Sequence, residues 1–169
     1  NKALTDRAFT DVKKTINDFK SEVHETSCYN YISNPIFNTG DYKNWELWDS
    51  TTSYSVQPDT SLSHTYSLKL QCSKRSQGIT QTVKGLQYGK TYTFKAKLKV
   101  EEGTPGLMVR NDNQWDGSLF KVDQGYNKWV EVSLTFMARE GTMPVYIGNV
   151  STSTVSTFWV SEVMLYEGS

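Results

Sequence analysis

Between residues 91 and 100 every second side chain is apolar, and this alternation limits the possible folds more than any other feature of the chain. A period of two places successive side chains on opposite faces of a β-strand, whereas a surface helix needs apolar residues three and four positions apart. Residues 129–136 alternate in the same way, with four apolar side chains on one face. Both segments therefore predict strands with one buried face and one solvated face.

Turn signals divide the rest of residues 29–169 into short segments. Glycine-containing turns fall at positions 84–85, 88–89, 103–106, 124–125 and 140–141. Strands that alternate with turns at intervals of about ten to twenty residues are typical of a β-sandwich or a jelly roll. The polar segment 151–157 is either a loop or a solvated edge strand.

Residues 1–28 follow a different period. Apolar residues at positions 9, 12, 16, 19 and 23 are spaced three and four apart, as in the seam of a coiled coil. This spacing predicts a helix from about Leu4 to Glu25 that associates with itself or with another protein, as a dimer or a trimer. The alternative, a helix packed on its own domain, usually carries a wider apolar stripe. We therefore expect a helical multimerisation segment at 1–28 and a separate β domain at 29–169.

The charge balance argues against several kinds of partner. Lys and Arg number 18, as do Asp and Glu, so the formal net charge is zero. A nucleic-acid or anionic-membrane partner would require a basic footprint, so we expect neither. No apolar run is long enough for a membrane span, and we find no signal peptide. The chain begins without Met, and we expect it to be a fragment or a processed product.

The two cysteines, Cys28 and Cys72, leave two alternatives open. Cys72 continues the inward parity of Leu68 and Leu70, which favours a buried free thiol. A disulfide with Cys28 would form if the protein matures in an oxidising compartment.

Catalytic motifs are missing from the sequence. His24 and His64 have no obvious partners, and there is no nucleophile elbow, phosphate-binding glycine loop or zinc motif. The stretch 111–117 resembles a calcium loop, but Trp115 occupies a ligand position and no glutamate follows at the required distance. We therefore predict that the chain is not an enzyme and has no cofactor.

Six motifs in a fixed order carry a resemblance to a known family. They are Asn34–Gly40, Ser67–Leu70, Gly78–Val83, Gly89–Phe94, Trp129–Phe136 and Val163–Gly168. In this order they resemble the β-jelly-roll carbohydrate-binding modules that accompany xylanases and glucanases and also occur in phage tail baseplates. The resemblance implies an all-β jelly-roll sandwich of two antiparallel sheets, here preceded by an N-terminal α-helix with coiled-coil heptads. It also implies sugar binding without catalysis.

Two aromatic and polar stretches, 44–49 and 110–116, match what a sugar requires. A flat aromatic ring suits the C–H face of a sugar, and amide, carboxylate or guanidinium groups suit its hydroxyls. Trp115 lies among polar residues and is either a ligand contact or a loop anchor. The predicted carbohydrate-binding residues are Trp115, Trp48, Tyr54, Arg110, Asn111, Asn113, Gln71 and Lys97. For the last two, an ordinary solvated sheet face is the alternative interpretation.

The resemblance also assigns structural roles. It implies that Trp45 and Trp129 belong to the core, while alternation requires that one of Phe158 and Trp159 is buried. Family members often place acids where this chain has Asn38 and the pair Ser161 and Glu162, so a structural calcium ion is not predicted.

Together these features predict a non-catalytic carbohydrate-binding module of a phage tail or baseplate protein. Its expected ligand is a saccharide of the host bacterial cell surface, and its expected protein partners are other tail proteins bound through the N-terminal helix in a homo- or hetero-oligomer. We therefore expect it in the virion. Two alternatives remain: a binding module of a secreted glycanase, and a structural baseplate domain without a ligand.

Overall fold

The computed structural model describes residues 29–38, 40–58 and 66–169, which form a sandwich of two five-stranded antiparallel sheets. In spatial order, sheet A consists of β1 (Glu46–Leu47), β4 (Gly78–Val83), β9 (Met143–Gly148), β6 (Gly106–Asn111) and β7 (Gln114–Leu119). Sheet B consists of β2 (Ser53–Pro58), β3 (Tyr66–Cys72), β10 (Ser156–Glu167), β5 (Thr91–Glu102) and β8 (Trp129–Met137). The predicted all-β sandwich is confirmed, whereas the predicted helix at 1–28 lies outside the described residues.

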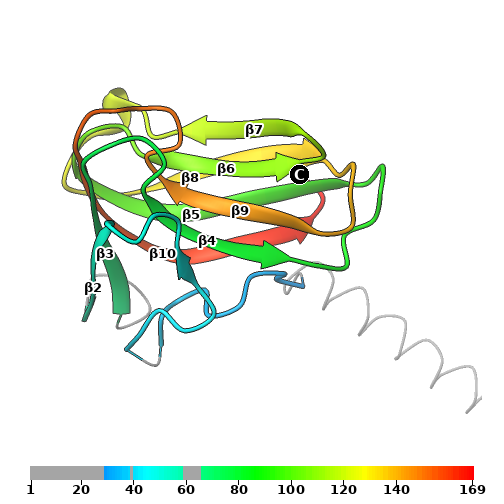
Figure 1. Cartoon of the computed structure of the whole chain (residues 1–169), viewed down its shortest axis with the longest axis horizontal. Helices are drawn as coiled ribbons and strands as arrows, with labels where there is room; N and C mark the ends of the chain where they lie inside the picture. The colour runs from blue at the N-terminus through cyan, green and yellow to red at the C-terminus, as the bar shows by residue number, and fades with distance from the viewer. Residues whose placement is uncertain (1–28, 39, 59–65) are drawn as a thin grey trace, which may run out of the picture.

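The chain passes repeatedly from one sheet to the other. Among the strands of the described residues, only the β2–β3 and β6–β7 connections join neighbours within one sheet. Figure 1 shows the strands of sheet A lying over β5, β8 and β10 of sheet B. As a result, residues that are far apart in sequence share each outer face.

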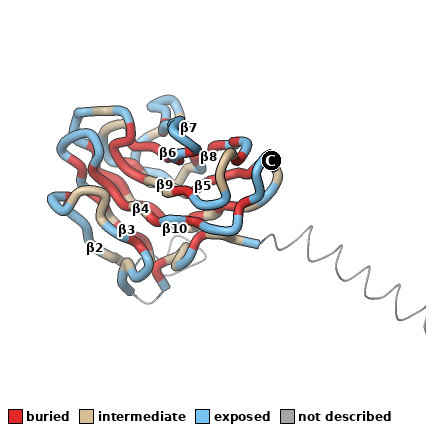
Figure 2. Tube along the Cα trace, turned by 45° about the vertical axis from the view of Figure 1, so that its right-hand side comes forward, coloured by how far each residue is buried: buried red, intermediate tan, exposed pale blue. Residues whose placement is uncertain are grey.

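The alternating sequence of β5 explains the core. Its inward side chains are at most 1% exposed, and they are Tyr92, Phe94, Ala96, Leu98 and Val100. In Figure 2 the buried segments follow the strands in the interior of the sandwich. The predicted strand is confirmed and continues to Glu102, which pairs with Thr157 of β10 beyond a register shift.

A bulge interrupts the pairing of β10 with β5 between Ser161 and Met164. Glu162 in this bulge has a φ of 50°, and the backbone N–H of Val163 donates to the carbonyl oxygen of Pro35 at 3.0 Å. Nearby, the Asn30 side chain donates to the carbonyl oxygen of Val163 and accepts from the N–H of Leu165. The first described residues are thus tied to the second half of β10.

The structure also tests the expectations for the polar segment 151–157 and for Cys72. Residues 151–155 form a loop, and β10 begins at Ser156. Cys72 is a buried free thiol, and burial raises the pKa of this thiol to about 11; Cys28 lies outside the described residues. Among the described residues, no helix is long and apolar enough to cross a membrane.

Candidate functional site

Three aromatic rings meet on the outer face of sheet A. Tyr146 occupies the middle of β9, where it pairs with Thr80 of β4 and Met108 of β6, and its parity directs it away from the core. The Tyr146 ring centroid lies 4.5 Å from that of Trp48 and 5.7 Å from that of Trp115. The three rings form a continuous aromatic surface across the sheet, which we call the sheet A aromatic cluster.

Backbone pairing at the edge of sheet A holds Trp48. Trp48 directly follows the two-residue strand β1, and its N–H donates to the carbonyl oxygen of Gly78 at 2.8 Å. Gly78 faces Gly148 across the β4–β9 pair, and both have a positive φ, of 150° and 153°. A Cβ atom on Gly148 would lie 2.2 Å from the carbonyl oxygen of Gln77, so this crossing of two strands requires glycine.

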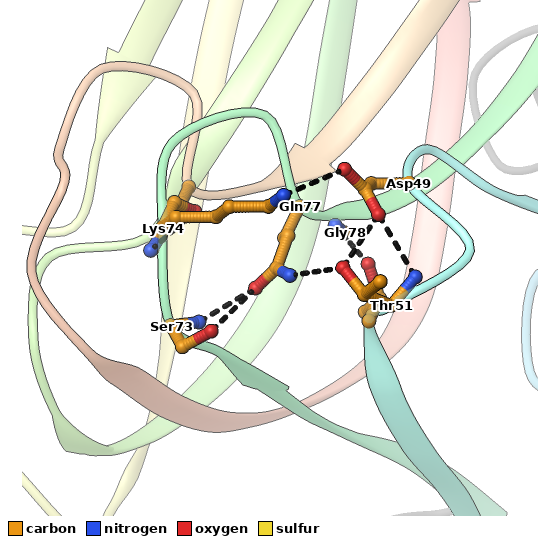
Figure 3. Close-up of polar contacts among 8 residues, drawn as sticks. Asp49, Thr51, Ser73, Lys74, Gln77 and Gly78 are labelled. Carbon is orange, nitrogen blue, oxygen red and sulfur yellow. Dashed lines mark hydrogen bonds and ion pairs between the residues drawn. The ribbon is translucent and has the colours of Figure 1, made fainter.

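Buried Gln77 connects the segment that follows Trp48 to the β3–β4 loop (Figure 3). Its Oε1 accepts from the N–H of Ser73 at 2.6 Å, and its Nε2 donates to Oγ1 of Thr51 at 2.7 Å. The N–H of Gly78 donates to Oγ1 of Thr52 at 3.1 Å. Because Gln77 bonds to both segments, the positions of Trp48 and of the β3–β4 loop depend on each other.

Asp49 completes this network (Figure 3). One of its oxygens accepts from the N–H and the hydroxyl of Thr51, at 2.8 and 2.6 Å, and the other lies 3.3 Å from Nζ of Lys74. The hydrogen bonds from Thr51, supported by the nearby Lys74, lower the pKa of the Asp49 carboxyl group. The carboxylate is therefore the form that holds this turn together at neutral pH.

Trp115 is presented by the β6–β7 hairpin. It lies directly opposite Arg110, and the guanidinium carbon of Arg110 is 5.5 Å from the Trp115 ring centroid. The turn residues Asp112 and Asn113 have φ values of 51° and 34°, which suit a tight two-residue hairpin. Trp115 is 52% exposed, so the hairpin holds a large aromatic surface in solvent.

Two hollows adjoin the pair formed by Arg110 and Trp115, and each is lined by one of the two residues. The first, of about 320 Å³, is lined by Trp48, Arg75, Ser76, Met108, Trp115 and Val150. The second, of about 310 Å³, is lined by Arg110, Asn113, Glu140 and Pro144. Apolar ring faces next to guanidinium, amide and hydroxyl groups are the combination that a sugar ring requires.

Burial in this cluster also affects Tyr146. Partial burial raises the pKa of its phenol, and the positive charge of Arg110 opposes that rise. The neutral phenol is therefore the form present near pH 7, and it offers both a hydrogen-bond donor and an acceptor. Among the described residues, no group of three or more His, Cys, Asp or Glu side chains is arranged to hold a metal ion.

The structure separates the predicted site residues into two groups. Trp48, Trp115, Arg110 and Asn113 line the two hollows of sheet A. Tyr54, Gln71 and Lys97 belong to strands of sheet B. Tyr54 is 42% exposed and its ring lies 4.5 Å from that of Tyr42, while Lys97 forms an ion pair with Glu162 at 3.0 Å.

Asn111 was predicted to contact a saccharide, but it lies inside the fold. Its side chain is 1% exposed, donates to the carbonyl oxygen of Met137 at 2.7 Å and accepts from the N–H of Arg139 at 2.8 Å. These bonds join β6 to the end of β8, so the amide is already used within the fold. The alternation along β6 directs Asn111 inward and its neighbour Arg110 outward.

The expectation that Trp129 lies in the core is wrong. Trp129 is only partly buried on the outer face of sheet B, directly opposite Lys99, whose ammonium lies 5.5 Å from the ring. Trp45 is 4% exposed and Phe158 is fully buried, with Trp159 facing outward, as expected. In β8 the buried residues are the even-numbered ones from Val132 onward, which places odd-numbered Trp129 on the outside.

Tyr146 is the functional candidate that sequence reasoning missed. The signal was present, because Met143, Val145 and Ile147 alternate with Pro144 and Tyr146 and so direct the tyrosine outward. The sequence could not show that β9 lies at the centre of sheet A, between Trp48 and Trp115.

Comparison with known proteins identifies the family. The family model described as Carbohydrate binding domain (CBM_4_9) matches residues 29–148. No curated protein sequence matches the chain.

Solved structures with the same fold come from different kinds of protein. Tailspike protein 4 of bacteriophage CBA120 aligns with a TM-score of 0.64 and 15% identity, over 82% of this chain and 21% of the tailspike chain. TmCBM61, solved with β-1,4-galactotriose, aligns with a TM-score of 0.62 and 15% identity, over 83% of this chain and 99% of that one. The CBM22-1 xylan-binding domain of Paenibacillus barcinonensis Xyn10C aligns with a TM-score of 0.60 and 14% identity, over 83% of this chain and 95% of that one.

These structural similarities establish the shared fold alone, because each identity is low. The family match is different, because it covers more than half of the chain and rests on sequence. It agrees with the aromatic rings and polar groups found on the outer face of sheet A. The chain belongs to this family of carbohydrate-binding domains, whose members are typically non-catalytic.

Proposed function

We propose that the sheet A aromatic cluster and its two hollows form the saccharide-binding site of a jelly-roll adhesion module. The observation that carries this proposal is the contact of Tyr146 with both Trp48 and Trp115, which gives a long apolar surface bordered by polar groups. Sugar rings placed on these aromatic faces would present their hydroxyls to Arg110, Asn113 and Arg75 in the adjoining hollows.

We further propose that the module belongs to a phage tail or baseplate and helps to hold a saccharide of the host bacterial surface. The similarity to a phage tailspike supports this context, as does the heptad spacing of residues 1–28. A multimerising helix would mount several modules together, and joint attachment strengthens individually weak contacts by avidity. The module would act in the virion, with other tail proteins as partners of the helix.

The alternative is a binding module of a secreted glycanase. It is supported by the similarity to the xylan-binding domain and to the galactotriose-bound module, each of which this fold covers almost completely. In that context the ligand would be a β-glycan such as xylan or β-1,4-galactan, and the heptad spacing of residues 1–28 would have no role in binding.

A binding assay separates these contexts. A fluorescent-protein fusion would be applied to bacterial cells, purified cell-wall glycans, xylan and β-1,4-galactan. We expect Trp115→Ala and Trp48→Ala to weaken saccharide binding about 10- to 100-fold, as loss of a central aromatic contact does in other interfaces. Tyr88→Ala is the matched control, because Tyr88 is 77% exposed and does not line either hollow.

The outcomes are distinct. Binding to bacterial surfaces that depends on both tryptophans would support the adhesion module, whereas binding restricted to xylan or β-1,4-galactan would support the glycanase module. No binding to any saccharide by a forced trimer would contradict both and would leave a structural domain without a ligand.

A further inference from the structure

The first hollow of sheet A is bordered on one side by loops. Trp115 and Met108 reach it from the strands of the β6–β7 hairpin, whereas Arg75 and Ser76 belong to the loop between β3 and β4. Val150 belongs to the loop between β9 and β10. Of the described residues that line the hollow, Arg75 is the one that carries a charge. The position and the partners of Arg75 therefore decide which ligand the hollow accepts.

Buried hydrogen bonds fix the backbone on both sides of Arg75. Asn149 is fully buried; its N–H donates to the carbonyl oxygen of Gln77, and its carbonyl oxygen accepts from the N–H of Ser76, both at 2.9 Å. The Asn149 side chain also donates to the carbonyl oxygen of Lys74 at 3.2 Å. Arg75 therefore extends from a pre-organised loop, and ligand binding would cost little ordering of its backbone.

The charge of Arg75 is not balanced by a neighbouring acid. Arg75 is exposed, and among the described residues its guanidinium has no ion pair or hydrogen bond. The adjacent Lys74 is paired with Asp49 at 3.3 Å. In the second hollow Arg110 and Glu140 occur together, so the opposite charges of that hollow balance. The first hollow thus keeps one positive charge.

The two acids in the strands of sheet A lie outside the first hollow. Glu46 is on the edge strand β1, and the register places Thr80 between it and Tyr146. Asp116 accepts a hydrogen bond from the inward-facing Asn111 at 3.4 Å. An anion in the first hollow would therefore meet no carboxylate among the described residues that line it.

Aromatic surface in the first hollow is open to a ligand. Trp48 and Trp115 both line it. Arg110 contacts the Trp115 ring but lines only the second hollow, so the Trp115 surface in the first hollow stays available. Within the described part of the chain Arg75 has no cation–ring contact, so it borders the two rings without covering them.

We propose that Arg75 makes the sheet A site selective for saccharides that carry a carboxylate or a phosphate. This inference rests on the proposed function, because it requires sugars to bind on the tryptophan surfaces. A sugar ring on Trp48 or Trp115 would place its acidic group at the guanidinium, which can donate two parallel hydrogen bonds to a carboxylate or a phosphate. A neutral saccharide would take water from the guanidinium without supplying a counter-charge.

The test compares glycans that differ only in the acidic group. Polygalacturonate would be paired with its carboxyl-reduced form, and phosphomannan with its dephosphorylated form, because each pair keeps the same linkages. The fluorescent-protein fusion of the whole chain would be titrated against each polymer at low and at physiological salt. We expect the acidic member of at least one pair to bind about tenfold more tightly at low salt, with a smaller difference at physiological salt. A preference within one pair alone would identify carboxylate or phosphate as the recognised group.

Variants that change one charge assign the preference to Arg75. We expect Arg75→Gln to bind both members of a pair equally and the neutral member within about threefold of the wild type, because the tryptophan surfaces are unchanged. Lys84→Gln is the matched control: Lys84 is exposed and follows the end of β4 opposite to Gly78, so its loss should leave the preference intact. Arg75→Lys keeps the charge without the planar fork and should retain part of the preference.

Failure of this proposal differs from failure of the proposed function. Trp115→Ala should weaken the binding of both members of a pair, because it removes a surface that they share. The selectivity is overturned, and the proposed function stands, if the wild type binds neutral and acidic members equally, or binds a neutral saccharide of the earlier assay but neither acidic polymer. It is also overturned if Arg75→Gln keeps the preference or Lys84→Gln loses it to the same extent. No binding to any glycan would overturn both proposals.

Discussion

The two outer faces of the sandwich use the same residue types in different arrangements. On sheet A, Trp48, Tyr146 and Trp115 contact one another and adjoin hollows of about 320 and 310 Å³. On sheet B, Lys99 separates Trp159 from Trp129, and the hollow lined by residues of β2 and β3 is smaller, at about 190 Å³. Cross-strand register produces the difference, because it decides whether the neighbour of an aromatic ring is another ring or a cation.

The strongest test of this comparison disturbs the close approach of β4 and β9 in sheet A, next to the carbonyl oxygen of Gly78 that accepts from Trp48. Gly148→Ala places a Cβ atom 2.2 Å from the carbonyl oxygen of Gln77, so we expect the free energy of unfolding to fall by about 3 kcal/mol. Urea unfolding measures this change. Gly89→Ala is the control, because it also has a positive φ but meets no atom within 4 Å, and we expect a loss of about 1 kcal/mol. Equal losses in the two variants would show that the close approach is unimportant.

Two glutamine variants compare how much the hydrogen bonds near each outer face contribute to stability. Gln77→Ala leaves the N–H of Ser73 without its buried acceptor, and we expect a loss of about 2 kcal/mol in the free energy of unfolding together with weaker saccharide binding at Trp48. Gln57→Ala removes one hydrogen bond to Trp159, and we expect a loss of about 0.5 to 1 kcal/mol. Thermal unfolding and titration with saccharide measure both effects. A larger loss for Gln57→Ala would reverse the comparison.

Acid should weaken the Asp49 network of sheet A. The pKa of Asp49 is lowered in the folded protein, so its contribution to stability is present above the ordinary carboxyl pKa of about 4 and is lost as the pH falls through the lowered value. We expect Asp49→Asn to show a smaller decrease in stability between about pH 5 and pH 2 than the wild type. Urea unfolding across this range measures it, and identical pH profiles would exclude a role for this carboxylate.

The smallest expected effect concerns the cation beside Trp115. Arg110→Gln removes a cation placed 5.5 Å from an exposed ring, and such contacts contribute about 0.5 to 1 kcal/mol. Differential scanning calorimetry would detect a correspondingly small decrease in the free energy of unfolding, and Arg110→Lys should retain part of the contribution. An unchanged free energy in both variants would show that the cation beside Trp115 does not stabilise the fold.

The sequence predicted the strands better than it predicted the site. Alternation in β5 and β8 directly reports which face is buried, so these strands could be derived from it. The exposure of Trp115 could be derived from the polar residues that surround it in the sequence. The neighbours of a residue on another strand depend on strand order and register, which local sequence does not encode. For this reason Tyr146 was missed, and Tyr54 and Gln71 were grouped with residues that lie on the other sheet.

The tie between the first described residues and β10 has a mechanical consequence. Asn30 and Tyr31 bond near Leu165, and Pro35 bonds to Val163, so the two segments run in opposite directions. Tension applied between residue 29 and residue 169 would load these hydrogen bonds one after another. The segment that begins at residue 29 would therefore detach from β10 at a low force, before the longer strands of the sandwich were strained. Its detachment would lengthen the chain and so reduce the tension on the rest of the module.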